Sequence, residues 1–592
     1  MGMTLMNSYR EIPRLRRSLV KVSVVMVLAA GGCNLDVENP NAPDAARAFS
    51  DPSGLQQLMG GAFRTWVETR GDYFGALTMT TMADSYTASW NNAAMRYYSS
   101  VGSDCTTRCG WNNSATAPEA AGGPSVEAQW YGYHTVLFSA NQVLIAVDDG
   151  VCFDEDCDAD NTLTSRNTAI AKMLQGMAFA GIAMVYDQGF VVDETSDLSN
   201  PTGLAFNTRT EVRDAALEKF EEAYTEAGLK TWSTPPEWMG VGSGRAYTSE
   251  QIRRIIRTMQ AELIAMWPRN AAENAQAAWA QVATFASQGI SSGTPFDFEF
   301  FIDVSGRECP ATGALDCIKA WGSSIGTMRV DTRLASILTS NHVHPWPDPN
   351  GNPCPTVSVD RRVGDGSWGP TDNFNGYSTK AATANAGTDF ACSGVAIFPP
   401  ARGQYHQSNL VHVRYQHLAF RGENLPGFDA TGQDPFYTRW MNDLLWAEGL
   451  IRSGGDKVLA AQKINNSRAT RGGLPALTGA ETDAQLLAAL QYEQEIEFMG
   501  QGPTPFFNRR RIDGLQSGTP RHMPVPAKEL DVLLREIYSF GGPGKPDMSV
   551  GGPALPNLSV MPGGGRPGGV RTVDEVWEDF RALRHAAGSR RR

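Results

Sequence analysis

Residues 249–287 read SEQIRRIIRTMQAELIAMW-PRN-AAENAQAAWAQVATFAS, two stretches joined only by Pro268-Arg269-Asn270. Both stretches repeat apolar residues at the three- and four-residue spacing of an amphipathic helix. Because the connection is so short, the two helices are expected to pack as an antiparallel pair. The same arrangement recurs at 435–453 and 457–470. Recurring helical pairs of this length predict a tetratricopeptide-like stack.

The N-terminal half has the same helical character. Asp51-Pro52-Ser53 offers a helix start, and apolar periodicity then continues to about Thr69. Further helices are expected over 126–147, 164–187 and 210–227. The expected fold class is therefore mostly α, a tetratricopeptide-like helical-pair scaffold. An irregular all-helical domain is the alternative.

Residues 291–433 have a different composition from the helical blocks on either side. They are rich in Gly, Pro and Asn, and they contain strand-like runs such as Phe296–Ile302. Two of the four close-set cysteine couples also fall here. This pattern predicts a long, loop-rich insertion, stapled by disulfides, that decorates the helical scaffold.

The first 32 residues have the pattern of a lipoprotein signal peptide. Residues 1–17 are basic, Ser18–Ala30 are mostly apolar, and small residues precede Cys33. The apolar run is too short for a comfortable membrane span. Cys33 is therefore the expected lipidation site, and residues 33–52 the tether. An ordinary secretory peptide with a chance cysteine is the alternative, and the choice between general and twin-arginine export stays open.

The other eight cysteines form four couples along the chain. An even set of locally spaced cysteines behind an export signal predicts disulfides formed in an oxidising compartment. The expected local pairs are Cys105/Cys109, Cys152/Cys157, Cys309/Cys317 and Cys354/Cys392.

The formal net charge of −12 argues against nucleic acid as a partner. Beyond residue 540 the composition changes again. Residues 541–570 are a Gly/Pro-rich linker, and a short amphipathic helix is expected over Val573–Ala586 in the C-terminal segment 571–592. That segment ends in Arg590-Arg591-Arg592, for which a solvated basic tail is the favoured interpretation.

Five segments, in order, resemble the SusD/RagB family of outer-membrane nutrient-binding lipoproteins. The strongest is Tyr492-Glu493-Gln494-Glu495-Ile496-Glu497-Phe498-Met499-Gly500-Gln501-Gly502, followed by Phe506-Phe507-Asn508-Arg509-Arg510-Arg511. The others are Cys33-Asn34-Leu35-Asp36 with its Asn-Pro tether, Ala171–Phe179 with Tyr186–Gly189, Leu444–Leu450 with Ile464–Arg468, and His522–Leu530. The resemblance covers about 33–540. Gln501-Gly502-Pro503 and Asn508 depart from the family pattern, and residues 541–592 lie outside it.

The resemblance implies a SusD-like ligand-binding domain over 53–540 and no catalysis. It implies a protein anchored in the outer membrane by its lipid alone and facing the cell exterior. There it would capture a nutrient, usually an oligosaccharide, and deliver it to a TonB-dependent, SusC-like transporter without a required cofactor. Two alternatives stay open. One is a secreted, lipid-tethered glycoside hydrolase, and the other is a helical-repeat envelope scaffold that binds no small ligand.

Sugar binding would use aromatic faces for stacking and amide or charged groups for the hydroxyls. Loop aromatics and amides are therefore the candidates for ligand binding. They are Tyr86, Trp90, Asn91, Asn92, Tyr97 and Tyr98 in one cluster, then Trp111, and then Trp321, Trp346, Trp368 and Tyr377 in or near the insertion. For each single ring, packing in the core is the alternative.

Two charged clusters invite other interpretations. Glu493, Glu495 and Glu497 with the arginines 509–511 could suggest an active site, but buried ion pairs that fix one helix to its neighbours are favoured. The acidic loop after residue 148 places Asp154, Asp156, Asp158 and Asp160 at alternating positions, which suits a structural calcium ion. A solvated acidic loop pinned by a disulfide is the alternative.

Overall fold

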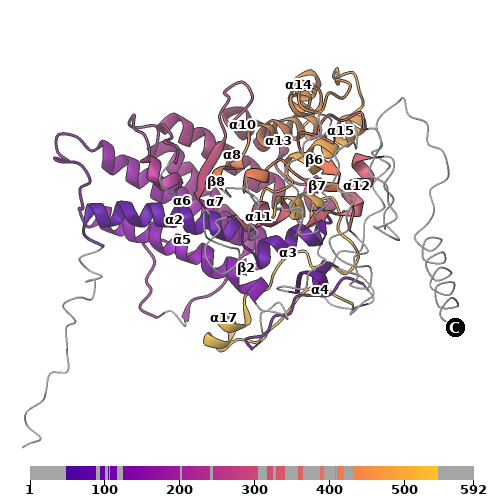
Figure 1. Ribbon diagram of the computed structural model, residues 1–592. Coiled ribbons are helices and arrows are strands. Elements are labelled where there is room, and N and C mark those ends of the chain that lie inside the picture. The colour runs from indigo at the N-terminus through magenta and orange to yellow at the C-terminus, as the bar shows by residue number, and fades with distance from the viewer. Residues whose placement is uncertain are drawn as a thin grey trace, which may run out of the picture. The chain divides into compact units, whose positions relative to one another are not determined.

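The computed structural model describes most of the chain after its first 48 residues. The chain divides into two compact units, Met1–Ala48 and Phe49–Arg592. All described residues belong to the second unit (Figure 1), and they are 49–87, 94–99, 105, 107–116, 124–200, 203–240, 244–303, 316–323, 328–339, 358–363, 387–392, 407–408, 410–418 and 431–543.

Long helices from the first half of the chain form the larger part of the core. Helix α6 packs between α5 and α7, and α2 packs on both α5 and α6. Their apolar positions recur at helical spacing, so each helix buries one stripe. These helices are α2 (Pro52–Arg70), α5 (Pro124–Asp148), α6 (Thr162–Val185), α7 (Arg209–Glu226) and α8 (Ser249–Met266), close to the predicted ranges.

Helix α6 is the centre of this stack. Among the described residues it is the one helix long and apolar enough to cross a membrane, but 89% of its most apolar window is buried inside the protein. Two of its glycines allow neighbours to approach closely. A Cβ on Gly181 would lie 2.3 Å from Tyr133 Cζ of α5, and one on Gly176 would lie 2.6 Å from Phe220 Cδ1 of α7. The apolar length of α6 therefore serves packing between helices.

Local sequence sets where several helices begin. The threonines before α7, α8 and the later helix α15 (Asp483–Glu497) accept a hydrogen bond from the third helical N–H. The side-chain oxygen of the Glu or Gln at that third position accepts a hydrogen bond from the threonine N–H, which completes a capping box. The three boxes are Thr208/Glu211, Thr248/Gln251 and Thr482/Gln485.

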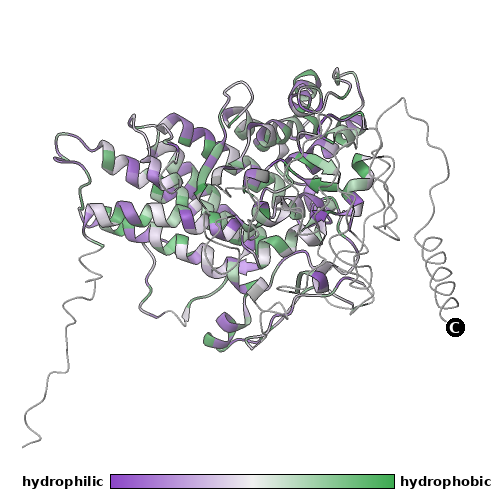
Figure 2. Ribbon diagram, viewed as in Figure 1, coloured by the Kyte–Doolittle hydropathy of each residue, from purple (hydrophilic) through white to green (hydrophobic). Residues whose placement is uncertain are grey.

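The second half of the chain adds another helical layer, and the amphipathic helices show both polar and apolar residues in Figure 2. Helix α8 packs on α10, α10 on α13, and α13 on α14 and α15. These pairs confirm the predicted helical-pair scaffold. The additional helices are α9 (Ala271–Ala275), α10 (Trp279–Gln288), α13 (Arg439–Arg452), α14 (Lys457–Arg468), α16 (Thr504–Arg510) and α17 (Ala527–Val532).

Two predicted helix boundaries are wrong. The expected helix over 271–287 is interrupted between α9 and α10, where the Trp279 indole N–H folds back to donate to Asn274 O at 2.8 Å. The expected helix start at Pro435 belongs instead to strand β8 (Thr431–Tyr437), and α13 begins after Thr438, whose hydroxyl caps Met441 N. A proline has no backbone N–H to donate. It is tolerated in β8 because a strand with one partner leaves alternate N–H groups outside the inter-strand hydrogen bonds.

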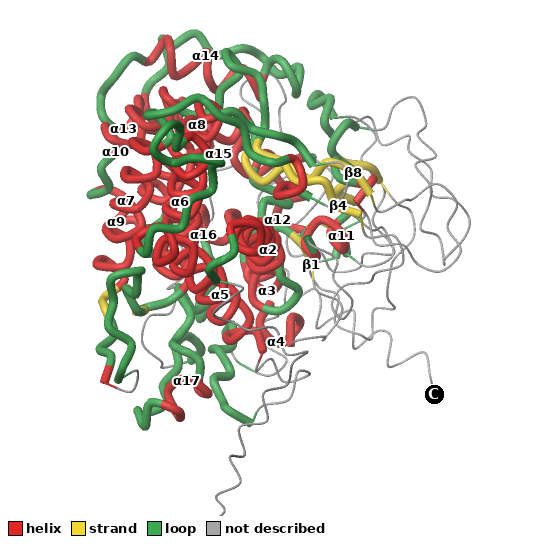
Figure 3. The backbone as a smooth tube through the Cα atoms, turned by 90° about the vertical axis from the view of Figure 1, so that its left-hand side faces the viewer, coloured by secondary structure: helices red, strands yellow, loops and turns green. Residues whose placement is uncertain are grey.

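The described strands form four antiparallel two-stranded sheets. The longest joins β4 (Phe298–Asp303) to β8, so the predicted strand near 296–302 is confirmed and the two ends of the predicted insertion lie side by side. Figure 3 places these strands on one side of the fold and the α5–α8 stack on the other. The shorter pairs are β1 (Tyr86–Thr87) with β5 (Arg329–Val330), β2 (Gln188–Gly189) with β3 (Asn207–Thr208), and β6 (Phe390–Cys392) with β7 (Leu410–His412).

Candidate functional site

A second, smaller apolar core is formed by short elements from the part of the chain where most ligand-binding residues are predicted. We call this region the loop platform. It contains β1, β5, β6, β7, the segment 358–363, α11 (Cys317–Gly322) and α12 (Thr332–Leu338), and it packs against α3 (Gly75–Met82) and α15. Several undescribed segments begin and end at these elements. The platform therefore fixes the ends of the segments that carry most of the ligand-binding predictions.

The described aromatic candidates mostly belong to the core. Tyr86 and Tyr98 are fully buried, Trp111 is 4% exposed and Trp321 is 5% exposed. The Tyr86 hydroxyl lies 2.7 Å from His412 Nδ1, and the Trp111 indole N–H donates to His522 O at 2.9 Å. Their predicted role as ligand contacts is corrected here, because a buried ring has no free face on which a sugar can stack.

The remaining aromatic candidates divide into two groups. Tyr97 is partly buried, with its ring edge-on to Tyr98 at 5.2 Å, so it keeps some exposed surface. The others lie outside the described residues, and their role in ligand binding stays a prediction: Trp90, Asn91, Asn92, Trp346, Trp368 and Tyr377.

The acidic helix α15 holds the loop platform by buried ion pairs. Residues 493 and 497 are one turn apart and share a face, while residue 495 lies on the opposite side of the helix. Glu495 makes a two-pronged pair with the Arg333 guanidinium of α12, at 2.9 and 2.7 Å. Glu493 accepts from Arg362 at 2.5 Å, and Arg362 also binds Asp360 within the platform. The predicted buried ion pairs are confirmed.

Glu497 completes this network on the same face as Glu493. It binds Arg414 at 2.8 Å and Arg471, and it accepts from the Ser467 hydroxyl at 2.6 Å. Burial would raise the pKa of Glu497, but the neighbouring arginines 414, 471 and 362 outweigh burial and lower its pKa to about 2. Arg471 reaches onward to both carboxylate oxygens of Asp389, next to β6, at 2.7 Å. Glu497 is therefore a charged structural anchor.

Two of the family-like segments, Leu444–Leu450 and the strongest one, which ends at Arg511, meet in a further buried ion pair. Arg511, directly after α16, binds both oxygens of Glu448 in α13 at 2.6 and 2.7 Å. The Gln494 amide of α15 also donates to Glu448, at 2.8 Å. Burial would raise the pKa of Glu448, and Arg511 and Arg452 lower it to about 2. These three helices are thus locked together at one carboxylate.

Arg510, one residue earlier, has a different environment. Its guanidinium donates to the carbonyls of Met184 and Met266, at 2.8 and 3.1 Å, near the C-termini of α6 and α8. Helix C-termini carry partial negative charge and unpaired carbonyls, so they suit a cation. Burial lowers the pKa of Arg510 well below its usual range. Arg510 therefore joins two core helices through their carbonyls, and it pairs with no carboxylate among the described residues.

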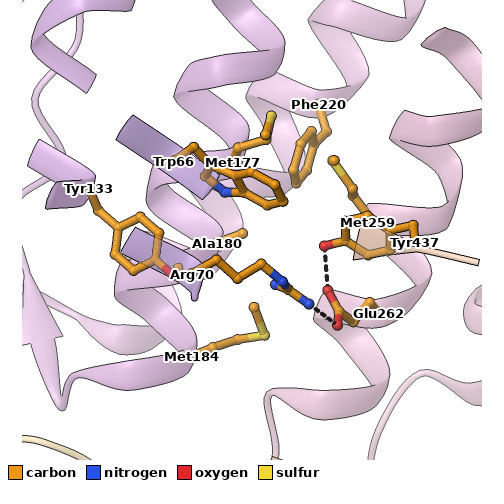
Figure 4. A pocket seen from close by; sticks show the side chains of 11 residues that line it. Trp66, Arg70, Tyr133, Met177, Ala180, Met184, Phe220, Met259, Glu262 and Tyr437 are labelled. Carbon is orange, nitrogen blue, oxygen red and sulfur yellow. Dashed lines mark hydrogen bonds and ion pairs between the residues drawn. The ribbon is translucent and has the colours of Figure 1, made fainter. Parts of the chain in front are cut away.

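A small closed cavity lies inside the main stack, between α2, α5, α6 and α8 (Figure 4). The Arg70 guanidinium sits over the Trp66 and Tyr437 rings and binds Glu262 at 2.7 Å, while the Tyr437 hydroxyl donates to Glu262 at 2.5 Å. The cavity volume of about 10 Å³ is room for one water molecule. Arg70 Nε has no hydrogen bond to the described residues, so a water there would have a polar partner. This cavity is too small for a sugar.

The predicted calcium ligands have other contacts. Asp154 accepts from Leu163 N and Thr164 N, at 2.8 and 3.0 Å, at the start of α6. Asp156 and Asp160 accept backbone N–H bonds within the loop. Among the described residues, one cluster of three possible metal ligands occurs, Cys152, Asp154 and Cys157, and its two sulfurs form a disulfide. The structure thus gives three of the four carboxylates local capping roles, and calcium binding stays a prediction.

Two of the four predicted disulfides are confirmed, Cys105–Cys109 and Cys152–Cys157. Cys317 also takes part in a disulfide, but its predicted partner Cys309 lies outside the described residues. The same holds for Cys354 and for the side chain of Cys392. The signal peptide, Cys33 and the segment beyond Pro543 lie outside them as well.

Comparison with known proteins gives likeness of structure alone. No protein-family model matches the chain, and no curated protein matches it. A SusD homolog from Bacteroides thetaiotaomicron is 14% identical with a TM-score of 0.51, over 86% of this chain and 93% of that one. A SusD-like protein from Bacteroides fragilis is 12% identical with a TM-score of 0.50, over 78% and 86%. A SusD superfamily protein from Parabacteroides distasonis is 10% identical with a TM-score of 0.50, over 81% and 97%.

Proposed function

We propose that this chain, which has the fold of SusD-like proteins, is a member of the SusD/RagB family that binds a nutrient at the outer membrane. Its proposed task is to capture an oligosaccharide and deliver it, chemically unchanged, to a TonB-dependent, SusC-like transporter. The observation that carries the proposal is the agreement of two independent likenesses. The ordered motifs and the backbone fold each lead to the same group of proteins.

The buried contacts support the motif resemblance. The Leu444–Leu450 segment supplies Glu448, and the strongest segment supplies both Gln494 and Arg511, which bind that carboxylate. Residues that matched the family pattern one by one therefore act on one another in space. This supports family membership beyond the separate short matches.

Binding without turnover is proposed for the same reason. The three α15 carboxylates that could suggest an active site are buried, and each is paired with an arginine. A general acid or nucleophile must reach its substrate. These carboxylates are occupied as structural anchors instead.

Calorimetry with the mature chain and a panel of oligosaccharides tests the ligand class. We expect saturable binding to at least one glycan, and mass spectrometry of the recovered sugar should show it intact. Shorter products would favour the alternative of a tethered glycoside hydrolase, and no detectable binding to any glycan of the panel would favour a scaffold without small ligand.

Replacing Trp90, Trp346 or Trp368 by Ala should weaken affinity about tenfold where the ring stacks on sugar. Leu198→Ala, at a half-exposed position, is the matched control.

Metabolic labelling with a fatty acid tests the anchor. The mature chain should carry label at Cys33, and Cys33→Ala should release an unlabelled protein from the membrane. Since a stable anchor needs more than one acyl chain, a fully acylated cysteine is expected to retain the protein. An unlabelled wild-type chain would contradict the proposed localisation.

A further inference from the structure

Helix α5 exposes an apolar ridge toward solvent. Tyr131, Phe138 and Ile145 are 41%, 51% and 37% exposed and follow one another at intervals of two helical turns, which places them on one face. The Phe138 ring lies edge-on to Phe49, with 6.1 Å between the ring centroids, and keeps half of its surface exposed beside it. No Asp, Glu, Lys or Arg occurs between Glu127 and Asp148. We call this face the α5 ridge. An exposed helix face without charge is unusual for a surface in contact only with water.

The two ends of the α5 ridge differ in charge. At its start, Lys528 of α17 binds Glu127 at 2.7 Å and remains half exposed, and the Glu529 carboxylate also lies close to Tyr131. At its end the chain enters the loop 148–160, which holds seven acidic residues and no basic one. Most of those acidic side chains are exposed. The ridge therefore has an apolar centre and a strongly acidic end.

The C-terminal segment 571–592 has the complementary pattern. Its apolar residues follow helical spacing, and they are Val573, Val576, Trp577, Phe580 and Leu583. Its first half carries four acidic residues, and residues 581–592 carry five arginines and no acidic residue. As a helix, 573–586 would be about 20 Å long, similar to the distance from Tyr131 to Ile145 along α5.

We propose that the segment 571–592 docks on the α5 ridge as an amphipathic helix parallel to α5. Its apolar face covers Tyr131, Phe138 and Ile145. Its arginine-rich end then lies over the acidic loop 148–160, and its acidic start lies toward Lys528. This role is independent of the proposed nutrient binding.

The connection between the two parts allows this arrangement. Lys528 lies at the beginning of α5, where it binds Glu127, and the last described residues lie against the segment that precedes α5, where Trp111 N donates to Phe540 O at 3.0 Å. Residues 544–572 are Gly/Pro-rich, and a flexible chain of that length spans about 30 Å on average. The helix can therefore begin near the start of α5 and continue in the same direction.

Other occupants fit the charges less well. A second copy packed about a two-fold axis at Phe138 would bring Glu127 opposite Asp149, a like-charge contact. A membrane surface with anionic lipids would meet the acidic loop at one end of the ridge, and at the other end Lys528, which is already paired with Glu127. The basic end of 571–592 matches the acidic end of the ridge directly.

Hydrogen exchange on the full mature chain tests this proposal. Amides in 573–583 should exchange at least about tenfold more slowly than those in 545–570, at all protein concentrations tested. Phe138→Glu and, separately, Ile145→Glu should remove that protection, because both place charge on the apolar ridge. Val458→Glu, at a residue 53% exposed in α14, is the control and should leave it intact.

Reversal of Arg590, Arg591 and Arg592 to Glu should weaken the protection, and added salt should weaken it in the wild type. Unprotected 573–583 amides in the wild type would overturn the proposal. So would protection that survives both ridge variants, or protection that appears only at high protein concentration, which indicates a second copy. A thermal melt of each variant confirms that the fold is retained.

Discussion

The main helical stack and the loop platform are stabilised in different ways. In the stack, α6 buries almost its whole length against α2, α5 and α7, and the contacts are mostly apolar. In the platform the apolar core is smaller, and Arg333, Arg362 and Arg471 bind carboxylates on α15 and next to β6. Apolar packing has no preferred direction, whereas an arginine guanidinium donates its parallel hydrogen bonds to a carboxylate in one geometry. This difference indicates that the ion pairs hold the elements of the loop platform at defined positions relative to α15.

Exact position matters where loops emerge. Arg362 lies five residues after an undescribed segment that ends at residue 357, and Asp389 lies three residues after one that ends at residue 386. Both residues are held by charges from α14 and α15 or their flanks. A scaffold that fixes the described residues next to these segments suits a protein whose ligand-binding residues are predicted to lie in them.

The largest expected effect is on the platform. Arg362→Met leaves the buried Asp360 without its cation and Glu493 with only the more distant Arg468 at 3.7 Å, and the loss of one partner of a buried pair costs about 3–5 kcal/mol. Denaturant unfolding should show the loss, and hydrogen exchange should rise first in 358–363 and in β6 and β7. The neighbouring exposed Arg361→Met is the control. Equal losses in the two variants would show that the buried ion pairs of Arg362 stabilise the platform no more than the exposed Arg361 does.

Acid should act on the platform through Glu497. Its folded pKa of about 2 lies below the usual 4.5, so its stabilising effect is complete above pH 4.5 and is lost as the pH falls toward 2. The loss is on the order of 3 kcal/mol. The free energy of unfolding, followed between pH 6 and 2, should fall less steeply in Glu497→Gln than in the wild type. Parallel curves would show that Glu497 is not a charged anchor.

A smaller effect is expected in the stack. Gly181→Ala places a methyl group 2.3 Å from the Tyr133 ring, and such overpacking costs about 1–3 kcal/mol. Gly61→Ala in α2 is the matched control, because nothing lies within 4 Å of its added Cβ. That variant should be neutral or stabilising, by up to about 1 kcal/mol. Thermal melts compare the two, and a neutral Gly181→Ala would contradict close packing of α5 on α6.

The smallest effect is expected in the acidic loop. Asp154→Ala removes the acceptor of two N–H groups at the start of α6 and should cost about 0.5–2 kcal/mol. Asp158→Ala, at an exposed position, should cost almost nothing. Chelation of calcium should leave the melting temperature of the wild type unchanged, because capping accounts for the contacts of Asp154. A drop on chelation in the wild type would show instead that the loop holds calcium.

The long helices could be predicted because each repeats apolar residues at one spacing over several turns. Residues 52–69 and 210–227 illustrate this, since their predicted and observed limits nearly coincide. The break between α9 and α10 could not, because it depends on one tryptophan that folds back on its own chain. The β8 strand was missed because its partner β4 lies far away in the sequence.

The candidate site was harder to predict for a physical reason. The sequence around a tyrosine or tryptophan does not show whether its ring is buried in a core or exposed on a binding surface. Tyr86 and Trp321 could therefore not be distinguished from exposed rings. The charged residues of α15 were correctly assigned to ion pairs. Their partners, such as Arg362 for Glu493, are brought together only by the tertiary fold.

Purification of the tagged full-length chain from detergent-solubilised outer membranes tests the central proposal most directly. The account predicts that a large TonB-dependent β-barrel protein co-purifies with the wild-type chain, and that a glycan bound by the complex is recovered intact. Recovery of the chain as a lone, unlipidated monomer that binds no glycan would contradict it.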